Sequence, residues 1–161
     1  MPLAIRPATQ SDVPRMIDIA RRAFLSAFGS TAPFPLIHQW ARNDREATSY
    51  PRDWALMFVL ERDGVIAGLV QPTLDEINGL WIHPDCQGQG IGSRLLRYGE
   101  DIILDRGYAR SWLTCSTYNT RALDFYRRRG YTVFHSSSKL HDCGVDEESF
   151  GMERTLQNAG T

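Results

Sequence analysis

The sequence has little of what marks an exported, membrane-spanning or disulfide-rich protein. Its three cysteines, Cys86, Cys115 and Cys143, are an odd number without a CxxC spacing, so we expect no disulfide framework and a reducing compartment. The longest apolar run, residues 54–60, is far shorter than the ~20 residues that cross a bilayer. The N-terminal residues also lack the apolar core of a signal peptide. We therefore expect a cytoplasmic location.

An excess of charge of either sign is missing as well. Lysine plus arginine number 18 against 19 acidic residues, which gives a net charge of -1, and Lys139 is the single lysine. Without an overall basic field, we expect neither nucleic acid nor a membrane surface as a partner. A chain of 161 residues that is 42% hydrophobic can bury a core of its own. We predict one domain over residues 1–161.

Hydrophobic periodicity and turn residues predict the order of elements βααβββαβαββ. The predicted helices cover residues 13–28, 36–48, 91–106 and 119–129. The predicted strands cover residues 3–8, 54–61, 65–73, 77–83, 110–116, 131–134 and 150–156. The polar residues 135–149 carry no assignable pattern. The fold class that follows is α/β (α+β), with a mixed, mostly antiparallel central sheet of about seven strands flanked by about four helices.

The segment that carries chemistry is LWIHPDCQGQGIGS, residues 80–93, in which a strand enters a glycine-rich loop that opens a helix. The first N–H groups of a helix have no partners within it, and the helix dipole adds positive potential there. Gly88, Gly90 and Gly92 let the backbone approach a ligand closely. The segment therefore predicts an anion site, most naturally for phosphate. A dinucleotide fingerprint is excluded because Ser93 stands where its last glycine belongs, and a Walker loop because GK[ST] is absent.

Two motifs at this spacing resemble those of one family. Gln87-Gly88-Gln89-Gly90-Ile91-Gly92 is similar to the Q/R-x-x-G-x-G/A signature of the GNAT superfamily of acyl-CoA-dependent N-acetyltransferases. The preceding EINGLWIHP resembles the strand that those enzymes place before the loop. The later WLTCSTYNTRALDFYRRRGY resembles their N-x-x-A-x-x-F/L-Y-x-x-x-G-F/Y segment. The resemblance extends along nearly the whole chain.

The resemblance implies acetyl-CoA as co-substrate and no metal. Loop amides at Gly88 to Ser93 would bind the pyrophosphate, and the backbone of residues 80–82 would pair with the pantetheine arm. Asn119 would hydrogen-bond the same arm, although a helix N-cap is a compatible role. Tyr126 would lie near the thioester sulfur and protonate the leaving thiolate, although helical spacing equally suits a core tyrosine. The implied cofactor-binding set is Leu80, Trp81, Ile82, Gln87, Gly88, Gln89, Gly90, Ile91, Gly92, Ser93, Asn119 and Tyr126.

Arginines near these motifs offer positive charge for the outer phosphates of the co-substrate. Arg94 and Arg97, or the run 127–129, are the candidates by charge alone. The competing interpretation is a solvated helix face.

The catalytic base is less defined, because an amine must lose its proton before it attacks and the sequence offers several acceptors. Glu76 is the first candidate and Asp75 the second. Glu76 shares strand parity with Leu80 and Ile82 unless a bulge intervenes, which would reverse its face. A surface carboxylate is the alternative. His83 before Pro84 favours a structural role over action through water.

Two further chemistries are disfavoured. Cys115 lacks a neighbouring His–acid pair in the sequence, so we do not expect it to carry the acyl group. His83, Cys86, His141 and Cys143 fit no zinc spacing.

The acceptor is expected between the first two helices and the late strands, with residues 26–35 as a cover. The acidic segment 135–149 suits a cationic acceptor, although a solubilising loop is the simpler interpretation. The predicted function is transfer of acetyl from acetyl-CoA to a primary amine of a small molecule or peptide by direct attack in a ternary complex. The alternative is a non-catalytic acyl-CoA-binding sensor. Members of the family often dimerise through their C-terminal strands, so the resemblance also allows a homodimer.

Overall fold

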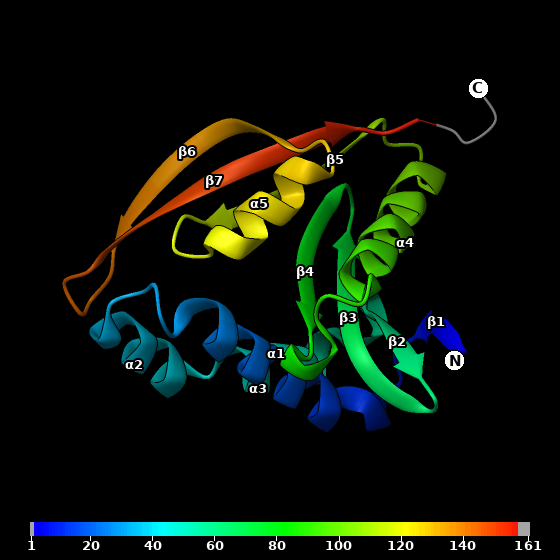
Figure 1. The fold of residues 1–161 in the computed structure, drawn as a ribbon, viewed down its shortest axis with the longest axis horizontal. Helices are drawn as coiled ribbons and strands as arrows, with labels where there is room; N and C mark the ends of the chain where they lie inside the picture. The colour runs from blue at the N-terminus through cyan, green and yellow to red at the C-terminus, as the bar shows by residue number, and fades with distance from the viewer. Residues whose placement is uncertain (1, 158–161) are drawn as a thin grey trace.

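A seven-stranded sheet in the order β1-β2-β3-β4-β5-β7-β6 forms the centre of the computed structural model, which describes residues 2–157 (Figure 1). Neighbouring strands are antiparallel except for β4 and β5, which are parallel. This confirms the predicted mixed, mostly antiparallel sheet. The strands are β1 Leu3–Pro7, β2 Phe58–Arg62, β3 Val65–Thr73, β4 Glu76–Ile82, β5 Arg110–Ser116, β6 Thr132–Leu140 and β7 Asp146–Thr155.

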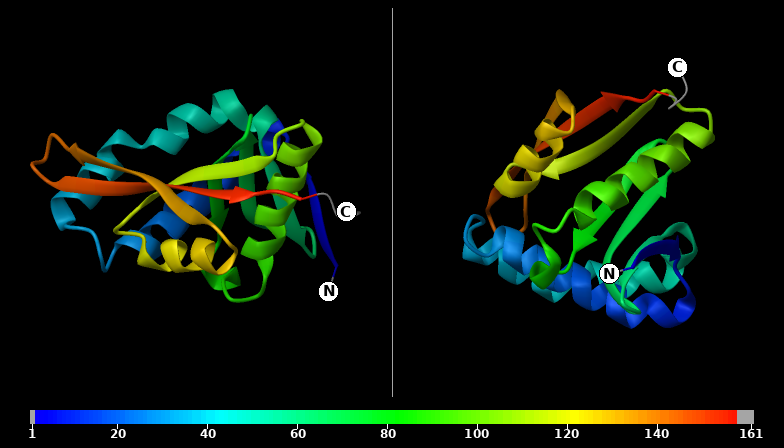
Figure 2. Two further views of the ribbon diagram at one scale, coloured as in Figure 1. Left: turned by 90° about the horizontal axis from the view of Figure 1, so that it is seen from above. Right: turned by 45° about the vertical axis from the view of Figure 1, so that its right-hand side comes forward.

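Helices cover both faces of the sheet (Figures 1 and 2). Within the described part of the chain they are α1 Val13–Phe28, α2 Phe34–Asn43, α3 Arg45–Asp53, α4 Ile91–Asp105 and α5 Thr120–Arg128. Short 3-10 turns lie at Gln10–Asp12, Trp54–Leu56 and Pro84–Cys86. In α1, Met16, Ile19 and Ala20 recur at helical spacing and are fully buried against one face of β2 and β3. Leu95, Leu96 and Ile103 of α4 bury the opposite face. None of these helices has the length and apolar content needed to cross a membrane.

Two predicted boundaries are wrong. The helix predicted over residues 36–48 is two helices, because Asp44 adopts a left-handed backbone with φ 42° and ends α2. The helices therefore number five rather than about four within residues 2–157. The strand predicted from residue 54 begins at Phe58, because Trp54–Leu56 form a 3-10 turn directly after α3.

Residues 135–149 are part of a long hairpin rather than a polar connection. The strands β6 and β7 pair from Thr132↔Glu153 to Leu140↔Asp146, and the hairpin extends beyond the rest of the sheet (Figure 1). Its tip contacts Gln39 of α2: the Cys143 N–H donates to Gln39 Oε1 at 2.9 Å, and Gln39 Nε2 lies 3.4 Å from His141 Nδ1. Within the hairpin, His141 Nε2 lies 2.9 Å from Glu147 Oε1.

The parallel strands β4 and β5 separate soon after they meet. Their register consists of the single pair Glu76↔Trp112, after which the strands diverge (Figure 2). Because β3 pairs with the other edge of β4, the edge that faces β5 is left open from Gly79 to Ile82. This opening positions the candidate site.

Candidate functional site

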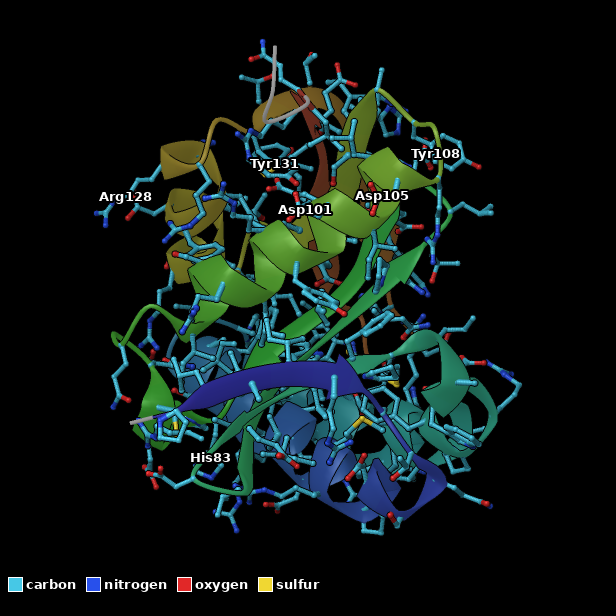
Figure 3. The ribbon with its side chains drawn as sticks, turned by 90° about the vertical axis from the view of Figure 1, so that its right-hand side faces the viewer. His83, Asp101, Asp105, Tyr108, Arg128 and Tyr131 are labelled. Atoms are coloured by element: carbon cyan, nitrogen blue, oxygen red, sulfur yellow. The ribbon has the colours of Figure 1, made fainter. Side chains whose placement is uncertain are left out.

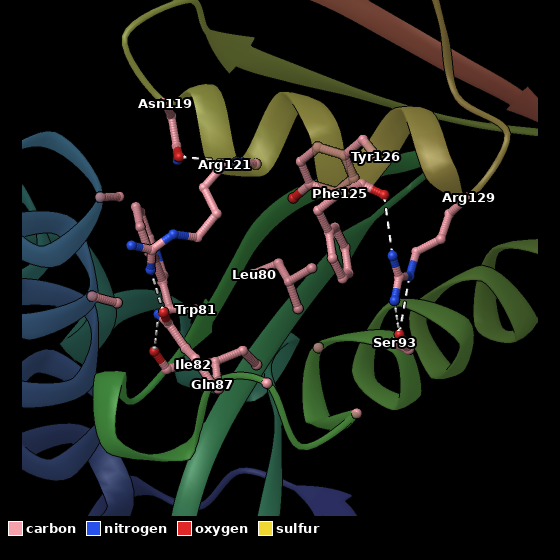
Figure 4. A pocket seen from close by; sticks show the side chains of 16 residues that line it. Leu80, Trp81, Ile82, Gln87, Ser93, Asn119, Arg121, Phe125, Tyr126 and Arg129 are labelled. Carbon is pink, nitrogen blue, oxygen red and sulfur yellow. Dashed lines mark hydrogen bonds between the residues drawn. The ribbon is translucent and has the colours of Figure 1, made fainter. Parts of the chain in front are cut away.

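A cavity of about 260 Å³ lies where β4 and β5 have separated (Figure 4). Four elements line it: β4, the loop that leads to α4 with the first turn of that helix, α5, and α1. Of the predicted cofactor-binding residues, the structure brings together Leu80, Trp81, Ile82, Gln87, Gly88, Gly90, Gly92, Ser93, Asn119 and Tyr126.

Glycine is required in the loop for two different reasons, backbone conformation and close packing. Gly88 and Gly90 have φ values of 77° and 80°, and a Cβ at either would meet nothing within 4 Å, so backbone conformation is what requires them. Gly90 is the N-cap of α4 and supplies no side-chain cap, which leaves the first-turn N–H groups available to a ligand. At Gly92 a Cβ would lie 3.3 Å from the Phe125 ring, so this glycine lets α4 and α5 pack closely.

Two predicted side chains lie elsewhere. Ile91 is 1% exposed and packs in the core beside Leu95, so only its backbone belongs to the loop. Gln89 is exposed, and its amide oxygen accepts from Arg62 at the β2–β3 hairpin. The predicted contribution of these two residues to donor binding is therefore one of backbone amides, and it stays a prediction.

Gln87 connects the two walls of the cavity. Its Nε2 donates to the Ile82 carbonyl at 3.3 Å, and its Oε1 accepts from Arg121 of α5 (Figure 4). The contact ties the loop to α5 across the opening.

Among the arginines predicted for the phosphates, Arg129 is the one that lines the cavity. Its Nε donates to Ser93 Oγ at 3.0 Å, and its guanidinium lies 3.7 Å from the centre of the Phe125 ring. Burial, with the nearby Arg128 second, lowers the pKa of Arg129. Arg128 instead points away from the fold and pairs with Asp124, one turn back on α5 (Figure 3). The remaining candidates, Arg94, Arg97 and Arg127, are exposed.

The helix α5 presents Asn119 and Tyr126 to the cavity. Asn119 Oδ1 accepts from the Ala122 N–H at 3.2 Å, which confirms the N-cap role and leaves the side-chain NH₂ free to donate to a ligand. The ring of Tyr126 extends from α5 toward β4 (Figure 4) and is 9% exposed. Burial raises the pKa of its hydroxyl, and the neighbouring Cys115 raises it further.

Glu76 lies on the opposite face from the one its parity with Leu80 suggested. In the pairing of β3 with β4, Ile77 opposes Pro72 and Gly79 opposes Gln71, which leaves Asn78 as a bulge residue. Ile77, Leu80 and Ile82 consequently face α4, and Glu76 faces the side that α1 covers. Desolvation, with Asp75 second, raises the pKa of this half-buried carboxyl. Glu76 therefore flanks the cavity without lining it.

The residues that the sequence disfavoured for catalysis or metal binding have structural roles or are unsuited to that chemistry. His83 Nδ1 accepts from the Asp85 N–H at 3.1 Å and so caps the turn Pro84–Cys86. Burial raises the pKa of the Cys115 thiol to about 12, which leaves little nucleophilic thiolate at neutral pH. Among residues 2–157, no three His, Cys, Asp or Glu side chains gather as metal ligands would.

Comparison with known proteins identifies the family. The model of the acetyltransferase (GNAT) family matches residues 13–131, which include the loop, β4 and α5. The chain belongs to the GNAT family. The prediction that it is an acetyl-CoA-dependent N-acetyltransferase is thereby confirmed.

Three proteins similar to this GNAT chain match it over most of its length. An S-alkylcysteine N-acetyltransferase from Bacillus subtilis is 28% identical over 154 residues, which is 87% of this chain and 84% of the relative. Among solved structures, a GCN5-related N-acetyltransferase from Rhodopseudomonas palustris has a TM-score of 0.83 at 23% identity, with 97% of each chain covered. The PaiA N-acetyltransferase from Thermoplasma acidophilum in complex with coenzyme A has a TM-score of 0.75 at 20% identity, with 97% of this chain and 100% of that chain covered. These two structural comparisons show that the chain has the same fold as the two proteins.

The residues of this GNAT chain fit the acyl donor that the family uses. The open edge of β4 offers backbone N–H and C=O groups to the amides of an extended arm, as an added strand would receive them. The uncapped first turn of α4 and the cationic Arg129 suit a pyrophosphate at the end of that arm.

Sequence reasoning missed several lining residues. Ala23 and Ala27 of α1 line the cavity at one helical turn apart, together with Arg121 and Phe125 of α5. The spacing of the two alanines was visible, but small residues on an amphipathic helix indicate core packing just as well. Nothing in the sequence indicated which arginine of the run 127–129 turns inward.

Proposed function

We propose that this chain transfers an acetyl group from acetyl-CoA to a primary amine of a small molecule or peptide, by direct attack in a ternary complex. The observation that carries the proposal is the divergence of β4 and β5 after the single pair Glu76↔Trp112. It leaves the β4 edge open beside the uncapped N-terminus of α4, so one continuous surface receives both an extended amide arm and a phosphate.

The backbone does most of the donor binding. N–H groups of residues 80–82 would pair with the arm, and the amides from Gly88 to Ser93 would donate to the pyrophosphate. Arg129, which donates to Ser93 in this structure, would turn its remaining N–H groups to the phosphate oxygens. The bound donor supplies an activated acetyl thioester, and the residues of the chain orient it.

Glu76 would accept the proton of the attacking amine. An alkylammonium has a pKa of ~10.4, so the amine is almost fully charged at neutral pH and needs a carboxylate nearby. Glu76 stands at the last pair before the strands separate, on the side away from α4 and α5. Its raised pKa makes it a stronger base than an exposed glutamate. A water molecule held by Glu76 is an equivalent route for the proton.

Tyr126 would act at the sulfur. A thiol has a pKa of ~8.5 and a phenol one of ~10, so full proton transfer from Tyr126 to a thiolate is unfavourable, and burial makes it more so. Hydrogen-bond donation from its O–H to the departing sulfur stabilises the developing charge without that cost. We therefore propose that Tyr126 keeps its proton throughout, and that the coenzyme leaves as a thiolate that this hydrogen bond stabilises.

The remaining features are proposed on composition. We infer one domain over residues 1–161, of which Met1 and residues 158–161 lie outside the described part. We also infer a cytoplasmic location and an amine acceptor rather than nucleic acid or a membrane, since the net charge is -1. The proposed reaction uses no metal ion.

The experiment is to follow release of free thiol from acetyl-CoA across a panel of amines. Turnover that saturates with both substrates, with acetylated amine found by mass spectrometry, is the expected result. Binding of acetyl-CoA without amine-dependent thiol release would contradict the proposal and favour an acyl-CoA sensor. A double-reciprocal plot with parallel lines would instead contradict direct attack, because it indicates a covalent acyl-enzyme.

A further inference from the structure

We propose that Gln71 and Thr73 of β3, together with Glu76 of β4, form an acceptor subsite that binds a second polar group of the amine substrate. The inference rests on the proposed function and goes beyond it by naming the class of acceptor. The acceptor it points to is an amine with a second hydrogen-bond donor, such as a diamine or an amino alcohol.

Strand register places the three side chains on one face. Thr73 opposes Glu76 and Gln71 opposes Gly79, and directly paired residues of antiparallel strands project to the same side. The next pair on that side is Leu69 with Trp81, both of which pack against the α1 cluster. This face is therefore apolar at the Leu69–Trp81 pair, where α1 packs on it, and polar nearer the β3–β4 turn.

One of these polar groups lacks the partner that buried groups normally have. Thr73 Oγ1 is buried without a hydrogen-bond partner, and within the described range 2–157 it is the single side-chain atom of that kind. Gln71, on the same face, is 7% exposed. An unpaired buried polar group costs stability, and most buried groups avoid that cost by pairing. A bound ligand is a partner that would account for the Thr73 hydroxyl.

The location suits the acceptor rather than the donor. The donor cavity is lined by Leu80 and Ile82 on the side of α4 and α5, and by Trp81, Ala23 and Ala27 on the α1 side. Gln71 and Thr73 also face the α1 side but lie outside this lining. Glu76, the proposed base, stands next to Thr73 on that side. An amine bound at Glu76 would thus extend past Thr73 toward Gln71.

Charge decides which second group fits. The strands β3 and β4 contain no lysine or arginine, and Asp75 and Glu76 add two carboxyl groups at their turn. Arg106, which follows α4, brings one positive charge there by donating to the Pro72 and Leu74 carbonyls, so acidic groups still outnumber it. The Gln71 and Thr73 oxygens can each accept a hydrogen bond. An ammonium or hydroxyl group is therefore favoured over a carboxylate, which the two acidic residues would repel, and over a methyl group, which would leave the buried Thr73 hydroxyl unpaired. Rotation of Thr73 about its first side-chain torsion would turn its hydroxyl to the ligand.

The test compares three amines of matched length: putrescine, aminobutanol and pentylamine. Calorimetry first establishes that each protein variant binds acetyl-CoA, which separates failure of the donor assignment from failure of the subsite. The wild type should acetylate putrescine and aminobutanol with a higher kcat/KM than pentylamine. Gln71→Leu and Thr73→Val should each reduce that preference by roughly threefold to tenfold, the effect of one lost hydrogen bond.

A matched control and a second readout keep the roles apart. Thr155→Val makes the same chemical change at an exposed position of β7 and should leave the preference unchanged. Thr73→Val should raise Tm or leave it unchanged, because it removes an unpaired buried hydroxyl. A clear fall in Tm would show that this hydroxyl holds the fold and would overturn its proposed role.

Two outcomes overturn the subsite while the donor assignment stands. In the first, wild-type protein that binds acetyl-CoA uses pentylamine as well as the polar amines, or uses none of the three. In the second, the preference persists unchanged in both Gln71→Leu and Thr73→Val. Absence of acetyl-CoA binding in folded wild-type protein would instead refute the proposed function itself.

Discussion

Arg129 and Ser93 join the end of α5 to the first turn of α4, since the guanidinium Nε of Arg129 donates to Ser93 Oγ at 3.0 Å. The contact spans the part of the cavity where backbone N–H groups converge. Desolvation lowers the pKa of Arg129, which means that burial disfavours its positive charge. A bound anion would stabilise that charge. We therefore propose that this pair receives the phosphate end of the donor.

Replacement of Arg129 by alanine should weaken acetyl-CoA binding about tenfold to a hundredfold, the effect of a hydrogen bond to a charged group. Arg128→Ala is the matched control, because Arg128 is exposed and pairs with Asp124 on the outer face of α5. Calorimetric titration of both variants with acetyl-CoA measures the difference. Equal affinities in the two variants would remove Arg129 from the phosphate site.

Gly90→Ala should lower both stability and donor affinity. A left-handed conformation costs a residue with a Cβ about 1–2 kcal/mol, and relief of that strain would turn the loop amides away from the ligand. Gly107, after the C-terminal end of α4, has φ 94° and equally open surroundings, so Gly107→Ala carries a similar strain far from the loop. Thermal melting should report comparable losses, whereas only Gly90→Ala should lose acetyl-CoA affinity. Comparable affinity losses would mean that global stability, not loop geometry, governs binding.

Tyr126→Phe should lower kcat by about tenfold to a hundredfold and leave acetyl-CoA affinity unchanged, because the ring keeps its packing on Phe125 while the hydroxyl is lost. Tyr131→Phe makes a contrasting change. Its hydroxyl donates to the buried Glu100 at 2.7 Å, so its loss should lower Tm and leave kcat near the wild-type value. Steady-state kinetics with melting curves separates the two. Wild-type kcat in Tyr126→Phe would refute a role at the sulfur.

Glu76→Gln should lower kcat about a hundredfold or more if the carboxylate is the base. In the wild type, activity should fall as acidification protonates Glu76, and its raised pKa moves that fall to higher pH than an ordinary glutamate gives. The variant should lack this acidic limb and keep the limb from deprotonation of the substrate amine. A pH–rate profile identical in shape to that of the wild type would assign the proton to another acceptor.

The same substitution should stabilise the fold at neutral pH. Because the carboxyl pKa is raised in the folded state, ionisation of Glu76 opposes folding, and stability is lost as pH rises through that pKa. Glu76→Gln should therefore have a higher Tm than the wild type at pH 7, with the difference vanishing well below pH 4.5, the ordinary glutamate value. A lower Tm at pH 7 would indicate that the carboxylate holds the structure together.

Local signals made the donor half of the site predictable. The glycine loop before Ile91 and the Asn119 N-cap follow from residue types at fixed spacing, and both appear where they were predicted. The core face of α4 follows from helical periodicity in the same way. These features depend on interactions between residues near in sequence.

The acceptor half depends on features that local patterns do not encode. The bulge at Asn78, which turns Glu76 to the other face, arises from pairing with Gln71 and Pro72 in a different strand. The β6–β7 hairpin lacks an alternating pattern because β6 is exposed along its whole length. Inward rotation of Arg129 requires Ser93 of another helix. Each of these depends on contacts between distant parts of the chain.

Hydrogen exchange of backbone amides tests most directly that the main chain holds the donor. Acetyl-CoA should slow exchange in peptides covering residues 79–82 and 88–93, while β1 and β2, at the far edge of the sheet, should exchange at their original rate. Saturating acetyl-CoA that protects neither segment in folded protein would contradict the account.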